Sequence, residues 1–383
     1  MGTFVFFKRE ISTPKTIGVL VSGGDCAGLN ATVRAITHHA TKTFNWRVVG
    51  IQRGYWGMWV RPLQTIELTP DVCDHQWVSS GGTFLRSNKN CHPPTFADGG
   101  KTYPNIDEAF CNAYNALGLS AIVVIGGDGS FNKLNQIHDF YNKTKKKGDH
   151  NEVNFIAIPK TIDNDVAYTD LAIGHETALD VVVEAIDNVQ FTAESHDRVM
   201  VVEVMGRDAG HIALKAGVAS GADAILIPEI PYNIDDLAKH IEHVYQSPQR
   251  HAIVVVAESV KTPDGETMRG TIGEEEQTRY RGIGENLAAR LKERVSADVR
   301  FVSIGHVQRG GRPRIKDRLL ANRFGVHAVD LIAKKQFSRV IVVVNGKMAD
   351  IHISEVANTI QRVDVNGEMV HIAKSLGIYI GNV

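Results

Sequence analysis

Nine short runs of apolar, mostly β-branched residues limit the folds open to this chain more than any other feature of the sequence. They are Thr16–Val21, Val48–Ile51, Ala121–Ile125, Asn154–Ile158, Val199–Val204, Ala224–Ile227, Ala252–Ala257, Phe301–Ile304 and Val340–Val344. Runs of this kind are typical of strands buried on both faces of a parallel sheet. Several precede segments with helical spacing, such as Glu176 to Gln190. Strands that alternate with helices predict an α/β protein built from right-handed βαβ units.

Nine strands are many for one sheet. We therefore expect two doubly wound (Rossmann-like), mostly parallel sheets, with the active site in the cleft between them. The first four runs are assigned to one sheet and the middle runs to the other.

The composition narrows the class of protein. The chain has 383 residues, of which 43% are hydrophobic and 22% charged, as in globular proteins. Its 42 basic and 43 acidic residues nearly cancel, which argues against a general nucleic-acid binder. No apolar run approaches the roughly 18–20 residues that span a membrane. Four scattered cysteines without metal-type pairs favour reduced thiols in the cytoplasm.

Glycine-rich turns follow two of the apolar runs. Gly126-Gly-Asp-Gly-Ser130 comes directly after Ala121–Ile125, at a place where open α/β sheets bind ligands. Its glycines let phosphate approach the backbone, and Asp128 can hold a magnesium ion. Ser22–Gly28 after the first run is a second glycine turn before a helix, either a phosphate-binding turn or an ordinary βα turn.

The segment Pro159–Asp165 places two carboxylates, Asp163 and Asp165, in a loop at the end of a strand. One can accept a proton from an attacking hydroxyl while the other helps to organise a metal. The alternative is ordinary turn chemistry, in which Asp and Asn are common.

Gly305–Pro313 is a basic segment after Phe301–Ile304. His306 and Arg309, with Arg300 just upstream, can bind a phosphate that does not react, because guanidinium groups make paired hydrogen bonds to phosphate. For each of these residues alone, a solvated basic loop is the alternative.

Together these segments describe phosphoryl transfer: a phosphate cradle, a metal carboxylate, a base and a basic anchor. A dinucleotide-dependent oxidoreductase is disfavoured, because no G-x-G-x-x-G with an acidic ribose partner appears. The lysine of a P-loop is also missing.

The order of these motifs resembles a 6-phosphofructokinase of the bacterial type, over residues 16 to 331. The matching segments are Ser22–Asp25, Gly81–Leu85, Gly126–Ser130, Pro159–Asp165, Val202–Arg207, Pro228–Pro231, Glu258 and Gly305–Gly311. The resemblance implies a glycolytic phosphotransferase that moves a phosphoryl group from ATP to the 1-hydroxyl of fructose 6-phosphate. Residues 1–173 with 309–360 would form the phosphoryl-donor domain, and 174–308 with 361–383 the sugar-phosphate domain.

The resemblance also implies a role for each site residue. Asp163 would be the general base, and Asp128 would bind Mg²⁺ with support from Asp165. The catalytic set would be Asp163, Arg207 and Thr161. The donor would be lined by Gly24, Lys89, Gly127, Asp128, Gly129, Ser130 and Lys160. The sugar phosphate would be bound by Thr161, Asp163, Arg198, Met205, Gly206, Arg207, Glu258, Arg300, His306 and Arg309. Arg198 and Arg300 would reach the site of a neighbouring subunit, in a homotetramer that binds neither nucleic acid nor membrane.

The phosphoryl donor is the main alternative. Members that use ATP have glycine at the position of Gly129, whereas typical members that use pyrophosphate carry aspartate there. Lys160 matches the pyrophosphate enzymes, although mixed signatures also occur among ATP-dependent members. We therefore predict ATP, with a pyrophosphate-dependent phosphotransferase as the alternative.

Two more distant alternatives are another kinase with a GGDG turn and a non-catalytic nucleotide-binding regulatory subunit. Such kinases, which act on NAD or lipids, lack the motifs at Thr161–Asp165 and His306–Gly311. A regulatory subunit would be expected to have lost Asp128 or Asp163, and both are present. The segment 261–276 is expected to be a polar surface loop.

Overall fold

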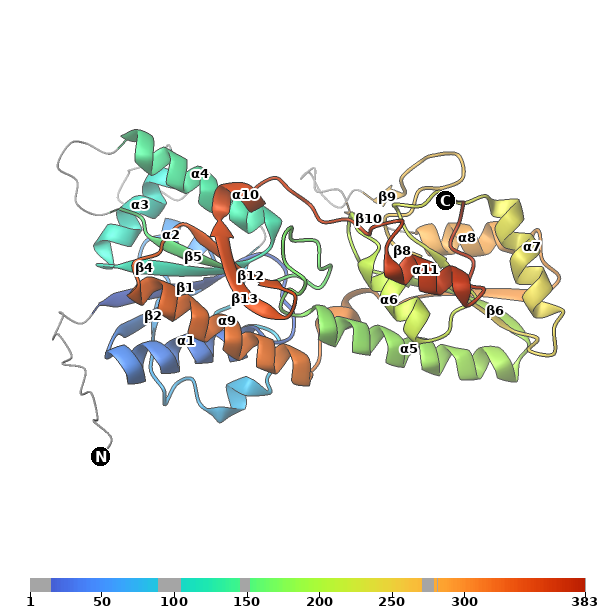
Figure 1. Cartoon of the computed structure of the whole chain (residues 1–383), viewed down its shortest axis with the longest axis horizontal. Coiled ribbons are helices and arrows are strands. Elements are labelled where there is room, and N and C mark those ends of the chain that lie inside the picture. Colours follow the sequence, from blue (N-terminus) through green and yellow to red (C-terminus); the bar gives the residue numbers. More distant parts are fainter. Residues whose placement is uncertain (1–14, 89–104, 145–151, 271–278, 281, 383) are drawn as a thin grey trace, which may run out of the picture.

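The computed structural model describes residues 15–88, 105–144, 152–270, 279–280 and 282–382. Two lobes lie side by side along its long axis, each built around one sheet (Figure 1). The chain ends in the smaller lobe after returning from the larger one (Figure 1).

The larger lobe contains a seven-stranded sheet, counted over the described residues, in the order β13-β12-β5-β4-β1-β2-β3. Its strands are β1 (Thr16–Val21), β2 (Arg47–Ile51), β3 (Thr65–Leu68), β4 (Ala121–Gly126), β5 (Phe155–Pro159), β12 (Arg339–Val344) and β13 (Lys347–His352). The five central strands are parallel, and the edge strands β3 and β13 are antiparallel to their neighbours.

Helices cover both faces of this sheet, as the apolar runs predict. They are α1 (Leu29–Phe44), α3 (Ile106–Ala116), α4 (Asp128–Thr144) and α9 (Ile315–Ala333), with the shorter α2 (Trp56–Trp59), η1 (His75–Val78) and α10 (Ile353–Val356). Side chains of β1 alternate between two buried clusters: Val19 packs on the side of α1 and α9, and Leu20 on the side of α3 and α4. This alternation follows from the period of two in a strand.

Within the described residues, the smaller lobe contains a four-stranded, all-parallel sheet in the order β11-β6-β8-β7. Its elements are α5 (His175–Ser195), β6 (Arg198–Val204), α6 (His211–Ala219), β7 (Ala224–Leu226), α7 (Ile234–Tyr245), β8 (Ala252–Ala257), α8 (Ile283–Lys292), β11 (Asp298–Ser303), η2 (Gly305–Arg309) and α11 (Glu368–Ser375). A hairpin of β9 (Arg269–Gly270) and β10 (Arg279–Tyr280) lies beside this sheet.

The predicted α/β class with two mostly parallel sheets is confirmed. The first four apolar runs lie in the larger sheet and the middle four in the smaller one, while Val340–Val344 joins the larger sheet as part of β12. The edge strands β3 and β13 were not predicted, because both are largely half-exposed and carry polar residues. The segment 261–276, expected to be a surface loop, includes β9 within its described part.

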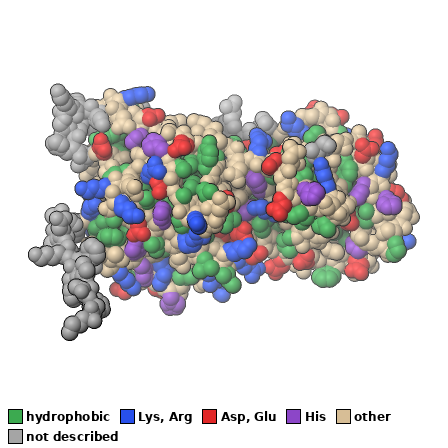
Figure 2. Space-filling view, viewed as in Figure 1, with side chains coloured by type: hydrophobic (Ala, Val, Ile, Leu, Met, Phe, Trp, Pro, Cys, Tyr) green, Lys and Arg blue, Asp and Glu red, His purple; other side chains and the backbone are tan. Residues whose placement is uncertain are grey.

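The surface agrees with the balanced charge of the chain. On the face shown in Figure 2, acidic and basic side chains are interspersed over both lobes. Among the described helices, none is both long and apolar enough to cross a bilayer.

Candidate active site

Three glycine- or lysine-bearing turns meet at the carboxyl ends of β1, β4 and β5. These strands are neighbours in the sheet, and β1 and β4 mark the point where the strand order reverses, which is where open α/β sheets bind ligands. The turns are joined directly: the amide of Ser22 donates to Ile125 O at 2.9 Å, and the amide of Lys160 donates to Gly126 O at 2.9 Å. The described residues predicted to line a phosphoryl donor therefore lie together.

The turn after β4 leads straight into α4, which begins at Asp128. A Cβ atom on Gly126 would lie 2.4 Å from the Cβ of Ser130, so only glycine fits this close approach. The hydroxyl of Tyr55 donates to Ser130 O at 2.9 Å and fixes the turn from the other side. Backbone N–H groups at the start of a long helix attract anions, so this turn is suited to phosphate.

Lys160 is buried between these turns, with 4% of its surface exposed. Its ammonium group donates to the carbonyl of Gly24, in the turn after β1. The lysine thus brings positive charge to the place where the turns after β1 and β4 meet.

The loop 161–165, which we call the Asp163 loop, carries two buried carboxylates. Asp163 is 6% exposed and Asp165 is 2% exposed. The amide of Asp163 donates to Thr161 Oγ1 at 3.0 Å, and the Thr161 hydroxyl lies 3.4 Å from Asp163 Oδ2. Within the described residues, Asp163 Oδ1 is buried without a hydrogen-bond partner. The loop therefore presents one free carboxylate oxygen.

Burial raises the pKa of Asp163, although Arg309, Arg207 and Lys160 act in the opposite direction. The pKa of Asp165 is raised to about 7 by burial and by the negative charges of Asp163 and Asp128. Carboxylates held this close to one another favour a bound proton or cation.

The smaller lobe contributes the turn after β6. The amide of Arg207 donates to Glu258 Oε1 at 3.0 Å, and Met205 and Gly206 precede it. Burial raises the pKa of Glu258 to about 7. The guanidinium of Arg207 crosses to the larger lobe and donates to Asp128 Oδ1 at 3.2 Å. The sugar-binding and metal-binding candidates are thereby joined across the lobes.

The basic segment after β11 forms η2, with His306 exposed to solvent. Arg309 donates from Nη1 to the carbonyl of Asp25 at 3.2 Å, a second contact between the lobes. Its Nε atom is buried and has no hydrogen-bond partner among the described residues. A buried donor without a partner is suited to an anionic ligand.

Arg198 and Arg300 do not join this cluster. Arg198 opens β6, whereas Met205 follows the last residue of that strand, so the strand separates them by roughly 20 Å. Both guanidinium groups donate to Asp298 Oδ2, at 3.1 Å from Arg198 and 3.0 Å from Arg300. These two arginines are therefore held as a pair on β6 and β11, with Arg198 at the amino end of β6, away from the carboxyl ends of the strands where the candidate site lies.

Metal binding has a partial basis in the geometry. Among the described residues, no group of three or more His, Cys, Asp or Glu side chains is arranged to hold a metal ion alone. Mg²⁺ in phosphoryl-transfer sites usually takes one or two carboxylates together with substrate phosphates and water. Asp128 and Asp165 fit that requirement.

One residue predicted to line the phosphoryl donor, Lys89, lies outside the described residues.

Sequence reasoning missed several buried polar residues that hold these loops. Asp317, fully buried at the start of α9, accepts hydrogen bonds from the amides of Gly174 and Thr177, both at 2.8 Å. The side chain of Gln308 accepts from the amide of Met205 at 3.2 Å. Gln308 could have been found because it lies within the motif after β11. Asp317 could not, because its sequence context is that of any acidic residue in the first turn of a helix.

Comparison with known proteins agrees with this arrangement. The profile of the family described as "Phosphofructokinase" matches residues 16–332. A Synechocystis protein named "ATP-dependent 6-phosphofructokinase 1" is 43% identical over 368 residues, covering 96% of this chain and 99% of the relative. A Nostoc protein of the same name is 41% identical over 380 residues, covering 97% of this chain and all of the relative.

Solved structures show the same fold. The T-state phosphofructokinase of Pichia pastoris matches with a TM-score of 0.76 and 29% identity over 91% of this chain, which spans 36% of that longer chain. A pyrophosphate-dependent phosphofructokinase from Marinobacter aquaeolei matches with a TM-score of 0.75 at 20% identity, covering 96% of this chain and 92% of the other. At that identity the likeness concerns the fold alone.

Proposed function

The chain belongs to the phosphofructokinase family, and on that premise we propose that it is a glycolytic phosphotransferase that moves the γ-phosphoryl group of ATP to the 1-hydroxyl of fructose 6-phosphate. The products are ADP and fructose 1,6-bisphosphate. Near-full-length relatives named ATP-dependent 6-phosphofructokinase support this activity.

One observation carries the mechanism: a buried acceptor and a buried donor, both without partners among the described residues, belong to one electrostatic cluster. The acceptor is Asp163 Oδ1 and the donor is Arg309 Nε. The positive charge of Arg309 counters the rise that burial causes in the pKa of Asp163. The free carboxylate oxygen is suited to receive the proton of the sugar hydroxyl, and the free N–H is suited to hold the 6-phosphate.

The remaining roles follow the same division. Thr161 orients Asp163 through its hydroxyl, and Arg207 stabilises charge on the transferring phosphoryl group. The sugar phosphate is bound by Thr161, Asp163, Met205, Gly206, Arg207, Glu258, His306 and Arg309, and the donor by Gly24, Lys89, Gly127, Asp128, Gly129, Ser130 and Lys160. Because alignment and charge neutralisation dominate phosphoryl transfer, the loops act mainly by holding these groups in place.

We propose Asp128 as the Mg²⁺ ligand, with support from Asp165. When bound, Mg²⁺ neutralises negative charge on the donor's phosphates. The raised pKa of Asp165 supports this role, because a nearby cation would relieve the repulsion among the three carboxylates. The guanidinium group of Arg207 lies 3.2 Å from Asp128 Oδ1, beside the proposed metal ligand.

ATP is favoured over pyrophosphate as the donor. The two relatives described above are named as ATP-dependent, and the pyrophosphate-dependent neighbour is similar in fold only. Gly129 is exposed and leaves open space where an aspartate would carry negative charge. Lys160, the residue shared with pyrophosphate enzymes, bonds to the turn at Gly24, so its position is also explained by holding that turn.

We further propose a donor domain of residues 1–173 and 309–360 and a sugar-phosphate domain of residues 174–308 and 361–383. The strands of the two sheets divide between these ranges. The enzyme would be a cytoplasmic homotetramer in which Arg198 and Arg300 serve a neighbouring site. The distance of Arg198, at the amino end of β6, from the residues at the carboxyl end of that strand supports this assignment. The free cysteines Cys26, Cys73 and Cys111 are consistent with a reducing compartment.

A coupled assay with ATP or pyrophosphate as the sole donor tests the proposal directly. We expect turnover of fructose 6-phosphate with ATP and Mg²⁺, and at least 100-fold less turnover with pyrophosphate. One unfavourable charge contact in the donor site gives discrimination of about this size. Turnover with pyrophosphate alone would establish the alternative donor. Asp163→Ser should fold, assemble and bind the sugar phosphate but lose about 10²–10⁴-fold in kcat. Near-normal turnover in that variant would rule out Asp163 as the base.

A further inference from the structure

The back of the Asp163 loop is held by a histidine that the mechanism above does not use. His175, the first residue of α5, is fully buried. Its Nδ1 atom lies 2.7 Å from the carbonyl oxygen of Ile162, the residue directly before Asp163. Its Nε2 atom lies 3.1 Å from Nζ of Lys215, which extends from α6.

These partners fix the tautomer of His175. A carbonyl oxygen only accepts, so Nδ1 carries the proton and donates to Ile162. Nε2 is then unprotonated and accepts from the Lys215 ammonium group. Burial, reinforced by the charge of Lys215, lowers the pKa of His175 to about 3, so the neutral ring persists throughout the physiological range. Lys215 thereby keeps the donor of His175 directed at the loop.

A second connection runs from α6, the helix of Lys215, to the other end of the Asp163 loop. His211, one turn before Lys215 on α6, lies with Nε2 3.1 Å from the carbonyl of Gln361. The amide of Gln361 in turn donates to Asp165 O at 2.8 Å. Two side chains four residues apart on one helix are therefore connected to both ends of the Asp163 loop, Lys215 through His175 and His211 through Gln361.

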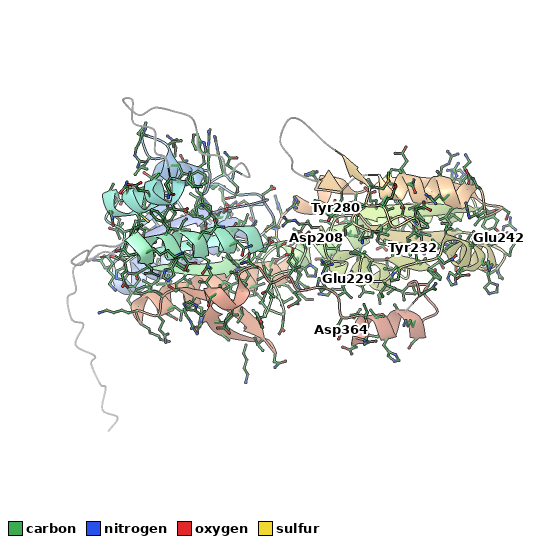
Figure 3. All side chains as sticks on the ribbon, turned by 90° about the horizontal axis from the view of Figure 1, so that it is seen from above. Asp208, Glu229, Tyr232, Glu242, Tyr280 and Asp364 are labelled. Carbon is green, nitrogen blue, oxygen red and sulfur yellow. The ribbon has the colours of Figure 1, made fainter. Side chains whose placement is uncertain are left out.

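Helix α6 also starts beside the sugar-binding candidates. It follows the turn that carries Arg207 and Asp208, and Asp208 O accepts from Arg362, the neighbour of Gln361, at 3.1 Å. Figure 3 shows Asp208 with Tyr280, whose hydroxyl donates to its carboxylate, at the end of the smaller lobe that faces the larger one. The helix thus connects the sugar-binding turn with the loop that carries Asp163.

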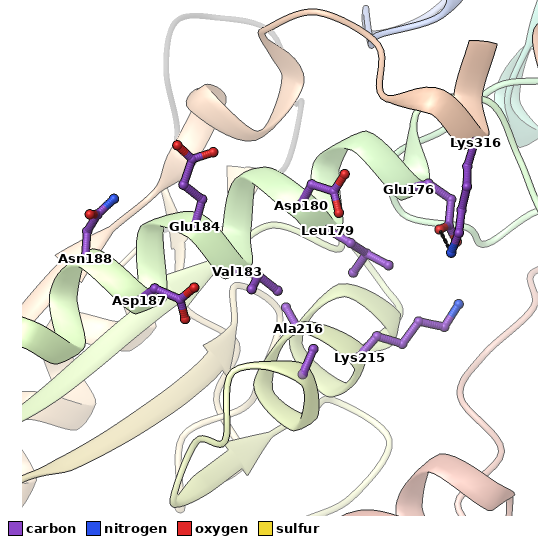
Figure 4. Close-up of a pocket in the computed structure, with 11 residues that line it drawn as sticks. Glu176, Leu179, Asp180, Val183, Glu184, Asp187, Asn188, Lys215, Ala216 and Lys316 are labelled. Atoms are coloured by element: carbon purple, nitrogen blue, oxygen red, sulfur yellow. Dashed lines mark hydrogen bonds and ion pairs between the residues drawn. The ribbon is translucent and has the colours of Figure 1, made fainter.

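Lys215 is accessible from an open hollow of about 570 Å³ between α5 and α6. Leu179, Val183 and Ala216 form part of its lining, and an ion pair of 2.6 Å between Glu176 and Lys316 lies at one end (Figure 4). Burial lowers the pKa of Lys215, while the charge of Glu176 raises it. Lys316 lines the same hollow, but its side chain is 76% exposed, so it provides a matched control for Lys215.

We propose that His175 and Lys215 are positioning residues for phosphoryl transfer: together they hold the peptide group of Ile162 and so fix the orientation of the Asp163 carboxylate. This inference rests on the proposed function, because it assigns the two residues to that reaction. Neither residue touches the reacting atoms. Their contribution comes from alignment, in which an error of about 1 Å costs on the order of 100-fold in rate.

The test compares four variants by steady-state kinetics. His175→Phe removes the donor to Ile162 and should lower kcat by about 30–100-fold, with the KM for fructose 6-phosphate and ATP changed by less than about 3-fold. His175→Asn returns an N–H donor near the Nδ1 position and should recover most of that loss. Lys215→Met removes the ammonium group and should lower kcat by about 3–10-fold, because the neutral ring can still donate. Lys316→Met should match the wild type.

Hydrogen exchange provides a readout that does not depend on activity. In the unliganded protein, amides of segment 160–173 should exchange faster in His175→Phe and Lys215→Met than in the wild type and Lys316→Met. If His175→Phe does not fold, Lys215→Met and His175→Asn still decide the matter. Unchanged kcat and unchanged exchange in Lys215→Met and His175→Phe would overturn the proposal. So would equal losses of kcat in Lys215→Met and Lys316→Met.

The outcomes also separate this inference from the proposed function. Wild-type protein without phosphotransferase activity would refute the function, while the exchange experiment would still report whether His175 and Lys215 order the loop. An active wild type whose variants show no change in kcat or exchange would refute only the positioning role.

Discussion

Replacement of Gly129 by aspartate provides the sharpest test of donor choice. A Cβ atom added at Gly129 meets no other atom within 4 Å, so the folded protein has room for a larger side chain there. The residue is the second of α4, where a negative charge interacts favourably with the helix dipole. We therefore expect Gly129→Asp to fold normally, with a melting temperature within a few degrees of the wild type.

The effect on ATP should nevertheless be large. The new carboxylate would stand in the turn that we assign to the donor's phosphates. Two like unit charges about 4 Å apart repel by about 4 kcal/mol at an effective dielectric constant of about 20. A penalty of that size corresponds to nearly 10³-fold in binding, and partial neutralisation by Mg²⁺ reduces it. We expect kcat/KM for ATP to fall by about 10²–10³-fold.

Gly129→Asn is the matched control, because it adds nearly the same volume without the charge. If charge dominates, Gly129→Asn should lose less than about 10-fold in kcat/KM for ATP; if crowding dominates, both variants should lose equally. The coupled assay measures both, with fructose 6-phosphate saturating. Retention of ATP activity within about 3-fold in Gly129→Asp would refute the assignment of this turn to the nucleotide's phosphates.

Three further predictions follow from other parts of the structure. Arg309→Ala should raise the KM for fructose 6-phosphate by at least 10-fold, because a charge-assisted bond to phosphate contributes about 1.5–3 kcal/mol; an unchanged KM would exclude it as the anchor. Asp317→Ala should lower the free energy of unfolding in urea by about 3 kcal/mol or more, because two buried amides lose their acceptor. A loss below about 1 kcal/mol would contradict that account. His175 should make the wild type sensitive to acid: its pKa is about 3 when folded and 6.5 ordinarily, so the unfolded chain binds a proton that the native state does not. Stability should fall as the pH drops below about 6.5, by up to about 1.4 kcal/mol per pH unit, and His175→Asn should show a shallower decline between pH 7 and 5.

The parts of the fold that could be predicted from the sequence are those buried on both sides. Runs such as Ala121–Ile125 and Ala252–Ala257 contain little besides β-branched and small apolar residues, and burial on both faces demands this composition. β3 and β13 could not be predicted, because edge strands are solvated on one side and tolerate polar residues. Their strand pairing depends on neighbours that no local pattern reveals.

The candidate site likewise has parts that could be predicted from the sequence and parts that could not. Turns such as Gly126–Ser130 could be predicted because their glycines stand next to the start of a helix in the sequence. That several such turns lie together follows from the parallel strands before them, which all end on the same side of the sheet. His175, Lys215 and Asp317 could not be predicted, because each acts on a loop reached only through tertiary packing. The roles of Arg198 and Arg300 came from the family resemblance and stay a proposal, because they require a contact with a second subunit.

The pairing of Arg198 and Arg300 on Asp298 has a consequence for enzyme concentration. If these arginines complete a neighbour's site, catalytic competence is a property of the assembly, and specific activity should decline when the enzyme is diluted below its dissociation constant. Because Asp298 contacts both guanidinium groups within one chain, part of the side-chain ordering needed for association is made inside that chain. The Arg198–Asp298–Arg300 cluster of one chain would then complete the active site of another.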